Sequence, residues 1–296
     1  MKKRVIIDTD PGIDDALALA LAIKSSELMI KAITIVAGNV VAEQGARNAL
    51  RVFDAFAGNL PLVYKEAEQP LKKALRTSLF HGEDGLGDCG WPISSRQYEN
   101  QSAVDVMIEL PKKYPNEITL ICLGPLTNLA LALKKDCEAI AKYKEVFIMG
   151  GAVEVPGNIT PNAEFNFWVD PEAASFVLNH IENTTTIFGL DVTRKVLLTP
   201  DAWKVFEERS EPVAELIVRM LRRFPQGLFI NDPLVILASI FPGLLEYVEC
   251  KKKLDVVLDG QNRGKLIFGE PANSSIKIAY KVKAKQAIDL FLERIN

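Results

Sequence analysis

Histidine and paired cysteine are scarce in this sequence. Its only histidines are His81 and His180, far apart in the chain, which excludes a zinc site of three histidines and any HExxH helix. The four cysteines form no CxxC pair. We therefore expect free or buried reduced thiols, which favours a cytoplasmic protein.

A basic surplus and a long apolar run are also missing. The 296 residues include 35 Lys and Arg against 38 Asp and Glu, which argues against nucleic acid as a partner. No apolar run reaches the ~18 residues of a membrane span, and because the apolar run after Arg4 is short we expect no signal peptide. We expect no membrane partner, and the 48% apolar content suits a globular protein.

Segments of strand and helix character alternate along the chain. Strands are predicted at 5–7, 30–36, 62–64, 118–123, 145–149 and 184–190, and helices at 14–23, 43–56, 103–110, 126–133 and from 170 onward. Later helices are predicted at 201–208, 211–223, 232–240 and 284–294, and late strands at 254–258, 265–268 and 276–282. This pattern predicts an α/β fold in one domain, 1–296, with a mostly parallel, doubly wound, Rossmann-like sheet. We expect helices on both faces of that sheet and an antiparallel edge from the late strands.

The most informative segment is acidic and lies where the first strand gives way to the first helix. Asp8, Asp10, Asp14 and Asp15 fall within eight residues that contain no Lys or Arg. In open α/β sheets, ligands bind at such strand ends. Carboxylates packed together repel one another, and a divalent cation with oxygen ligands, Ca²⁺ or Mg²⁺, removes that cost.

This segment has competing interpretations. Asp14 and Asp15 could simply cap the helix and complement its dipole, which leaves Asp8 and Asp10 unexplained. An EF-hand is excluded, because Gly12 stands fifth from Asp8 instead of sixth. A phosphatase of the haloacid dehalogenase type also uses Asp-x-Asp after its first strand, and it remains a competing hypothesis.

A series of short motifs follows the acidic segment. In chain order they are Ala37-Gly38-Asn39, His81-Gly82, Gly124-Pro125-Leu126-Thr127-Asn128, Met149-Gly150-Gly151, Gly157-Asn158, Ala163-Glu164-Phe165-Asn166, Asp170-Pro171-Glu172, Gly189-Leu190-Asp191 and Asp232-Pro233. Together with the segment 8–19 they resemble the signatures of the calcium-dependent nucleoside hydrolases, the inosine-uridine nucleoside N-ribohydrolases. The resemblance covers residues 4–290, nearly the whole chain.

The resemblance implies hydrolysis of the N-glycosidic bond of ribonucleosides to ribose and free base. It implies a Ca²⁺ cofactor held by the side chains of Asp10, Asp15 and Asp232 and by the carbonyl oxygen of Leu123. Asp10 would also activate a calcium-bound water, and Asp8 would support the site by hydrogen bonding. The residues implied for the sugar are Asp14, Asn39, Met149, Asn158, Glu164 and Asn166.

These residue types suit that chemistry. Cleavage of an N-glycosidic bond builds positive charge on the sugar, which a carboxylate-rich pocket stabilises. Each residue also has an ordinary structural explanation: Asn39 and Asn158 as turn residues, Asp232 as a helix cap, and Met149 as a core residue. The combination of motifs favours the enzyme over these separate explanations.

One position departs from the family pattern. Where relatives place a histidine or a tryptophan just before the last aspartate, this sequence has Asn231. Asparagine donates a hydrogen bond but transfers no proton near neutral pH. We therefore expect Asn231 to contact the substrate and His81 to act as the catalytic proton donor. Candidates for aromatic contacts to the base are Trp91, Trp168, Phe224 and Phe229.

The segment 85–90 formally matches GxGxxG, the dinucleotide fingerprint. It follows no apolar strand and runs into Trp91-Pro92 instead of a helix, so we reject a dinucleotide site. The glycines predict instead a mobile loop over the active site.

The sequence thus predicts a ribonucleoside hydrolase whose partner is a small-molecule nucleoside and which, by resemblance, forms a homodimer or homotetramer. The main alternative is a calcium-dependent ribose- or nucleoside-binding protein with little turnover, suggested by Asn231. The phosphatase ranks below both.

Overall fold

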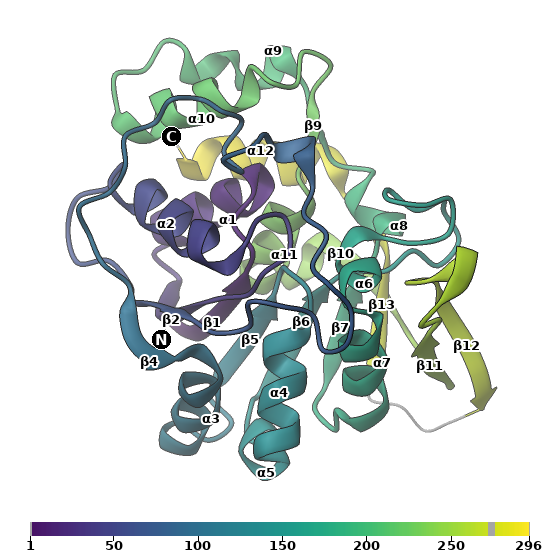
Figure 1. The fold of residues 1–296 in the computed structure, drawn as a ribbon. Helices are drawn as coiled ribbons and strands as arrows, with labels where there is room; N and C mark the ends of the chain where they lie inside the picture. The colour runs from purple at the N-terminus through teal and green to yellow at the C-terminus, as the bar shows by residue number, and fades with distance from the viewer. Residues whose placement is uncertain (1, 272–275, 296) are drawn as a thin grey trace.

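One large sheet runs through the molecule, as Figure 1 shows. The structure is a computed structural model that describes residues 2–271 and 276–295. Its nine strands lie in the order β10-β13-β7-β6-β5-β1-β2-β3-β4. The strands are β1 (Lys3–Thr9), β2 (Leu28–Ile35), β3 (Val63–Lys65), β4 (Glu99–Ser102), β5 (Ile118–Cys122), β6 (Glu145–Met149), β7 (Thr185–Phe188), β10 (Leu245–Glu249) and β13 (Ile276–Val282). All neighbouring strands are parallel except β10 and β13.

The central strands are apolar along their length because both faces of the sheet are covered. Alternate residues of a strand point to opposite faces. Val5 and Ile7 of β1 therefore pack into one hydrophobic core, and Ile6 packs into the other. This double burial explains why the sequence shows continuous apolar runs instead of alternation.

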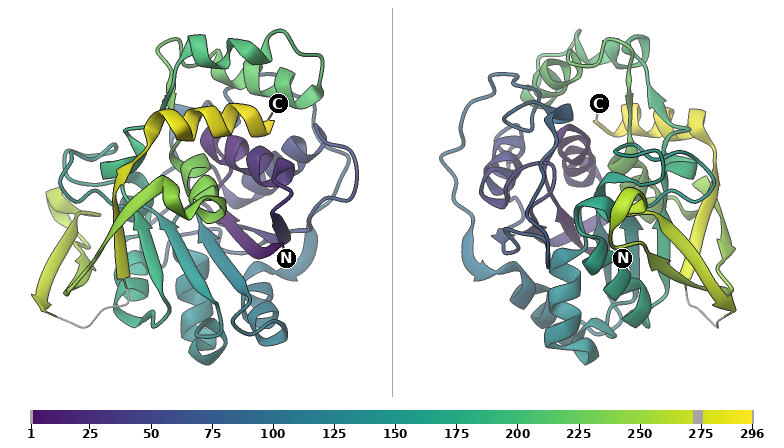
Figure 2. Two further views of the ribbon diagram at one scale, coloured as in Figure 1. Left: turned by 180° about the vertical axis from the view of Figure 1, so that it is seen from behind. Right: turned by 45° about the vertical axis from the view of Figure 1, so that its right-hand side comes forward.

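Helices form a layer on each face of the sheet (Figures 1 and 2). One core includes residues of α1 (Ile13–Lys24), α2 (Ala42–Phe53), α10 (Pro212–Leu221), α11 (Asn231–Ile240) and α12 (Ala284–Ile295). The other core includes residues of α3 (Ala103–Lys113), α4 (Thr127–Lys135), α5 (Cys137–Ile140) and α7 (Pro171–His180). Among the described residues, no helix is both long and apolar enough to cross a membrane.

Shorter elements complete the fold beyond these layers. They are α6 (Phe165–Val169), α8 (Leu190–Thr193), α9 (Pro200–Trp203), and two-stranded sheets of β8 (Leu197–Leu198) with β9 (Leu228–Phe229) and of β11 (Lys252–Val256) with β12 (Leu266–Pro271). Single turns of 3₁₀ helix are η1 (Leu79–His81), η2 (Lys204–Phe206), η3 (Pro242–Leu244) and η4 (Gly260–Asn262).

The order of the strands reverses beside β1. The chain moves from β1 outward through β2, β3 and β4, then returns to the other side of β1 at β5 and continues through β6 and β7. Ligands of open α/β sheets bind at such a reversal, outside the carboxyl ends of the strands. The fold therefore places the acidic segment after β1 and the carbonyl of Leu123 after β5 at the expected ligand crevice.

The predicted fold class is confirmed, with corrections in detail. The antiparallel edge consists of β10 alone, a strand that was not predicted, because β13 runs parallel to β7 while β11 and β12 form a separate ribbon. The strand β4, with the sequence Glu-Asn-Gln-Ser, escaped prediction because it is a polar and largely exposed edge strand with no hydrophobic pattern. The five-residue helix α6 is too short to show a helical period.

Candidate active site

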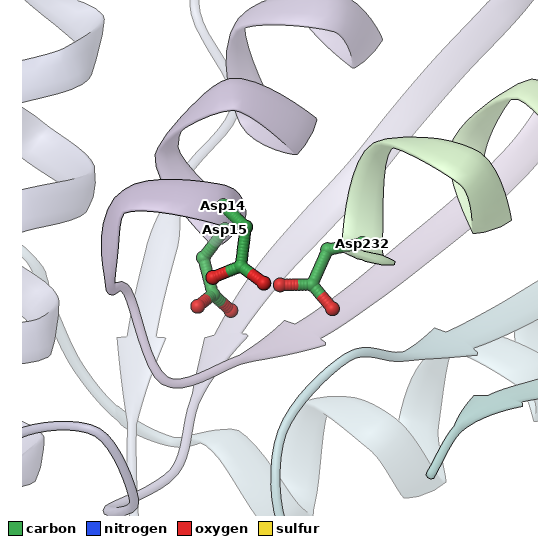
Figure 3. Close-up of side chains that lie close together, drawn as sticks. All are labelled: Asp14, Asp15 and Asp232. Atoms are coloured by element: carbon green, nitrogen blue, oxygen red, sulfur yellow. The ribbon is translucent and has the colours of Figure 1, made fainter. Parts of the chain in front are cut away.

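Carboxylates from separate parts of the chain meet at the strand reversal. Asp14 and Asp15 lie in the first turn of α1, and Asp232 lies in the first turn of α11. Figure 3 shows their side chains pointing toward one another. Ligand atoms of the three lie within 4.8 Å of one another, close enough to share a metal ion. The helices α1 and α11 pack side by side, which brings Asp232 to a site that otherwise consists of N-terminal residues.

Asp15 is held by donors from the turn that enters α1. Its Oδ2 accepts hydrogen bonds from the backbone N–H of Gly12 at 3.0 Å and from Nδ2 of Asn39 at 3.1 Å. Its Oδ1 accepts the hydroxyl of Thr9 at 2.5 Å and the N–H of Asp10 at 3.3 Å. Asp15 is thus more than a helix cap, because its carboxylate also connects β1 to the segment that follows β2.

Asp10 lies at the carboxyl end of β1 and is 1% exposed. Its Oδ2 accepts the N–H of Asn39 at 2.6 Å, while its Oδ1 is buried with no hydrogen-bond partner. A Cβ added at Gly38 or Gly124 would overlap this carboxylate. Both positions therefore require glycine, and the free oxygen of Asp10 is available to a ligand that the protein itself does not supply.

Burial raises the pKa values of these acids. Removal from water is the largest cause for Asp10, Asp14, Asp15 and Asp232, and the negative charges of neighbouring acids add to it for Asp10, Asp15 and Asp232. Among the described residues, no lysine or arginine forms an ion pair with any of them, and His81 is 3.8 Å from Asp14. A cation bound between them would lower these pKa values.

Asp8 lies inside the sheet, two residues before Asp10. It is fully buried in β1, and its Oδ1 accepts hydrogen bonds from Thr34 at 2.7 Å and from Nδ2 of Asn128 at 2.9 Å. Burial raises its pKa to about 7. Asn128 also accepts the N–H of Ala67 at 3.1 Å, so this interaction anchors the segment after β3 to the same strand.

A cavity of about 780 Å³ opens above the carboxylate cluster. Its walls include the predicted sugar-binding and metal-binding residues Asp14, Asn39, Leu123, Met149, Asn158, Glu164, Asn166 and Asp232, as well as His81 and Asn231. Asp10 and Asp15 are not among the lining residues and lie buried beside Asn39. The structure thus gathers residues that are more than 200 positions apart in the chain.

The short helix α6 supplies two polar residues of the cavity wall. Glu164 caps its N-terminus, with Oε1 accepting the N–H of Asn166 at 2.8 Å and Oε2 accepting the N–H of Gly151 at 3.0 Å. Burial raises the pKa of Glu164 to about 7. Asn166 donates through Nδ2 to the carbonyl of Leu123 at 2.6 Å. Asn158 is exposed at the rim, and its Oδ1 accepts the N–H of Phe165 at 2.8 Å.

His81 enters the cavity wall in a defined orientation. Its Nδ1 accepts the backbone N–H of Ile13 at 3.1 Å, so Nε2 carries the proton and lies on the side of Asp14. Burial lowers the pKa of His81 to about 4. Near neutral pH the ring is therefore uncharged and acts as an N–H donor. Asn231 also contacts Asp14, donating to its Oδ2 at 3.2 Å.

Sequence analysis missed several residues of the cavity. Phe80, Arg194 and Arg223 line it, and Phe80 packs against Phe224 with ring centroids 5.0 Å apart. The position of Phe80 beside His81 is a signal that could have been used. Of the aromatic candidates, the cavity includes Phe224 and Phe229, whereas the rings of Trp91 and Trp168 face Arg219 and Arg263 instead.

The glycine-rich segment makes hydrogen bonds of its own, and the mobility expected of it stays a prediction. Asp84 accepts the N–H groups of Leu86 at 2.8 Å and Asp88 at 2.9 Å. Leu86 is fully buried, and the glycines at 82, 85, 87 and 90 all have positive φ. Here glycine serves a tight backbone path. The segment lies between η1 and β4 and does not connect a strand to a helix.

Comparison with known proteins agrees with this geometry. The family model for the inosine-uridine preferring nucleoside hydrolase matches residues 5–289. The chain belongs to this family. As predicted, it is therefore an enzyme of the class that hydrolyses the N-glycosidic bond of ribonucleosides.

Individual nucleoside hydrolases match over most of their length. The chain is 41% identical over 294 residues to the non-specific ribonucleoside hydrolase RihC of Salmonella agona, covering 94% of this chain and 93% of that protein. It is 36% identical over 256 residues to uridine nucleosidase 1 of Arabidopsis thaliana, covering 83% and 76%. Among solved structures, the plant nucleoside hydrolase PpNRh1 has a TM-score of 0.91 and 31% identity, covering 100% and 99%. A purine-preferring ribonucleoside hydrolase from Gardnerella vaginalis has the same TM-score and identity, covering 99% and 98%.

The close packing around Asp10 leads to a first prediction. In Gly38→Ala, the new methyl group displaces the Asp10 carboxylate, and we expect kcat to fall by about 100-fold or more. Gly243→Ala is the matched control, because a Cβ at Gly243 meets no atom within 4 Å. Ribose release measures kcat, and circular dichroism checks that both variants fold. A folded Gly38→Ala variant with the kcat of the wild type would contradict this account of Asp10.

Proposed function

We propose that this nucleoside hydrolase cleaves ribonucleosides with a calcium ion held by Asp10, Asp15, Asp232 and the carbonyl oxygen of Leu123. The observation that carries the proposal is the buried cluster of carboxylates at the strand reversal, with an unpartnered oxygen on Asp10. All the proposed donors are oxygen atoms, which is the donor set that Ca²⁺ prefers. The cation would neutralise charge that no basic side chain neutralises within the described residues.

The proposed reaction assigns a separate task to each group. When bound, a calcium ion lowers the pKa of an attacking water and orients ribose hydroxyls. Asp10 accepts the proton of that water at Oδ1, the oxygen that has no partner in the protein. Its Oδ2 stays fixed by the N–H of Asn39, so the carboxylate of Asp10 cannot rotate away from the water.

The sugar is bound by polar residues of the cavity wall. We assign the ribose hydroxyls to the side chains of Asp14, Asn39, Asn158, Glu164 and Asn166, with Met149 against the sugar ring. Several of these groups are already oriented by backbone hydrogen bonds, as Glu164 and Asn158 are at α6. Preorganised acceptors and carboxylates stabilise the positive charge that develops on the sugar.

The leaving base is placed against His81 and the aromatic rim. His81 presents Nε2–H to the cavity and donates a hydrogen bond to the departing base, which stabilises the negative charge that the base acquires. Because the ring is uncharged near neutral pH, it serves here as a hydrogen-bond donor and not as the proton donor expected from the sequence. Asn231 adds an amide to the same wall and holds Asp14 in place. Phe80 and Phe224 provide flat apolar surfaces for a base.

Asp14 has a second candidate role, because the geometry groups it with Asp15 and Asp232. Calcium titration by calorimetry distinguishes the two roles. We expect Asp15→Asn and Asp232→Asn to weaken calcium binding by about 10-fold or more, whereas Asp14→Asn mainly raises KM. If Asp14→Asn weakens calcium binding as much as Asp15→Asn does, Asp14 is a ligand of the calcium ion and not a sugar-binding residue. The exposed Asp201→Asn is the control.

The calcium-dependent mechanism predicts the outcome of metal removal. Ribose release from uridine, cytidine, inosine, adenosine and guanosine identifies the accepted bases. We expect thorough chelation to abolish release and added calcium to restore it. Full activity without a divalent ion would refute the proposed mechanism, and tight ribose binding without release from any nucleoside would favour the binding protein.

The role of Asp10 predicts a different change. Asp10→Asn removes the proton acceptor but keeps the shape, so kcat should fall by about 10²-fold or more while the fold persists. Single-turnover ribose release measures the chemical step directly. A rate near that of the wild type would show that another group accepts the proton.

We also propose a cytoplasmic location, on the ground of the unpaired cysteines, and a homodimer or homotetramer, from resemblance to the family. Light scattering of the purified protein should give a molar mass of two or four chains of 32.7 kDa. A monomer at micromolar concentration would contradict the proposed assembly.

A further inference from the structure

A buried arginine lies outside the cavity and has no part in the proposed chemistry. Arg51, in α2, is 6% exposed, and its Nε has no hydrogen-bond partner. Burying a guanidinium group is costly, and replacing a buried ion pair such as Arg51–Asp84 by apolar side chains of similar volume is often neutral or stabilising. Its presence at this position therefore calls for an explanation other than stability.

The guanidinium group of Arg51 forms hydrogen bonds with the two residues that flank the glycine-rich segment 85–90. Nη1 donates to Oδ2 of Asp84 at 3.1 Å, and Nη2 donates to the carbonyl of Trp91 at 2.5 Å. The indole N–H of Trp91 returns a hydrogen bond to the carbonyl of Arg51 at 3.1 Å. One side chain of α2 thus holds both the start and the end of the segment 84–91.

Asn48, one turn earlier on α2, adds a second attachment. Its Nδ2 donates to the carbonyl of Asp84 at 2.8 Å and to the carbonyl of Pro11 at 3.0 Å. Pro11 belongs to the acidic turn that carries Asp10 and leads into α1. The helix α2 therefore fixes the glycine-rich segment relative to the carboxylate cluster.

The attached segment reaches His81 through its own hydrogen bonds. Oδ1 of Asp84 accepts the N–H groups of Leu86 and Asp88, which closes the turn. The N–H of Gly87 then donates to the carbonyl of His81 at 2.7 Å. The contacts form a continuous path from Arg51 to the histidine in the cavity wall.

We propose that Arg51 is a positioning residue for nucleoside hydrolysis, which acts by holding the segment 81–91 so that the His81 imidazole faces the cavity. This inference rests on the role proposed above for His81. A purely structural Arg51 would affect stability, whereas a positioning Arg51 affects the His81 ring and the step in which that ring takes part.

The first experiment compares Arg51→Met with Arg47→Met. Methionine keeps much of the volume of Arg51 and removes all of its donors, while Arg47 is exposed one turn away and pairs with Glu43 on the same helix. We expect Arg51→Met to lower kcat by about 10-fold or more with KM within about twofold, measured well below a melting temperature that falls because Asp84 and the carbonyl of Trp91 lose their donor. Arg47→Met should behave as the wild type. A kcat within about twofold of the wild type in Arg51→Met overturns the inference.

The second experiment tests whether the effect passes through His81. In the His81→Gln background, Arg51→Met should cause little further loss of kcat, because the group that Arg51 positions is gone. An equal loss in both backgrounds would overturn the inference. If His81→Gln itself leaves kcat unchanged while Arg51→Met lowers it, the proposed role of His81 fails and this inference fails with it. If His81→Gln lowers kcat while Arg51→Met leaves kcat unchanged, the role of His81 stands and only the inference about Arg51 is refuted.

The third experiment reads the His81 ring without any assay of activity. Because the chain has only two histidines, nitrogen and carbon NMR of the imidazoles resolves both, with His180 as an internal control. Wild-type His81 should show unprotonated Nδ1 and protonated Nε2, and Arg51→Met should shift its signals while leaving those of His180 in place. Unchanged His81 signals would overturn the inference even if no nucleoside is turned over.

A second variant, Asp84→Asn, tests the inference if Arg51→Met fails to fold. The asparagine oxygen can still accept from Leu86 and Asp88, while the ion pair with Arg51 is lost. We expect the same fall in kcat and the same shift of the His81 signals as in Arg51→Met. A folded Asp84→Asn with wild-type kcat and wild-type His81 signals would overturn the inference by itself.

Discussion

The structure depends on keeping acidic side chains together in a site that water scarcely reaches. Asp8, Asp10, Asp15, Asp232 and Glu164 are each 3% exposed or less, and Asp14 is 7% exposed. Burial and mutual repulsion both oppose their ionisation, so such a cluster costs stability unless donors and a cation compensate. The rest of the site follows from how that compensation is arranged. A cluster of this kind is suited to bind a divalent ion and to stabilise a cationic sugar, which are the two requirements of nucleoside hydrolysis.

Part of the compensation comes from the backbone at the carboxyl end of the sheet. Backbone N–H groups of Gly12 and Asn39 donate to Asp15 and Asp10, and the hydroxyl of Thr9 donates to Asp15. Close approach of these donors requires glycine on both sides of the Asp10 carboxylate. One oxygen of Asp10 is nevertheless left without a donor. The side chains of the site are thus ordered without a ligand, but their negative charge still needs a positive partner.

The groups proposed to face the base are held by a different part of the molecule. His81 and Phe80 belong to η1, and Phe224 and Phe229 belong to the segment between α10 and α11. Arg223 donates to the carbonyls of Leu79 and Phe80, both at 2.9 Å, which joins these two segments at the cavity rim. Because His81 and Asn231 both approach Asp14, this rim and the carboxylate cluster share one wall of the cavity.

The sequence by itself determined the fold class, the acidic turn and the order of the motifs. These are local features, because apolar runs, helix starts and carboxylates at a strand end are visible over a few residues. Only the tertiary structure decided which residues meet. It brought Asp232 to Asp14 and Asp15 through the packing of α1 against α11, and it fixed the orientation of His81 through a backbone N–H. It also showed that a formal GxGxxG segment is anchored by a buried arginine, which no pattern of spacing reveals. Such outcomes depend on contacts between distant segments, and packing and burial set those contacts once the whole chain has folded.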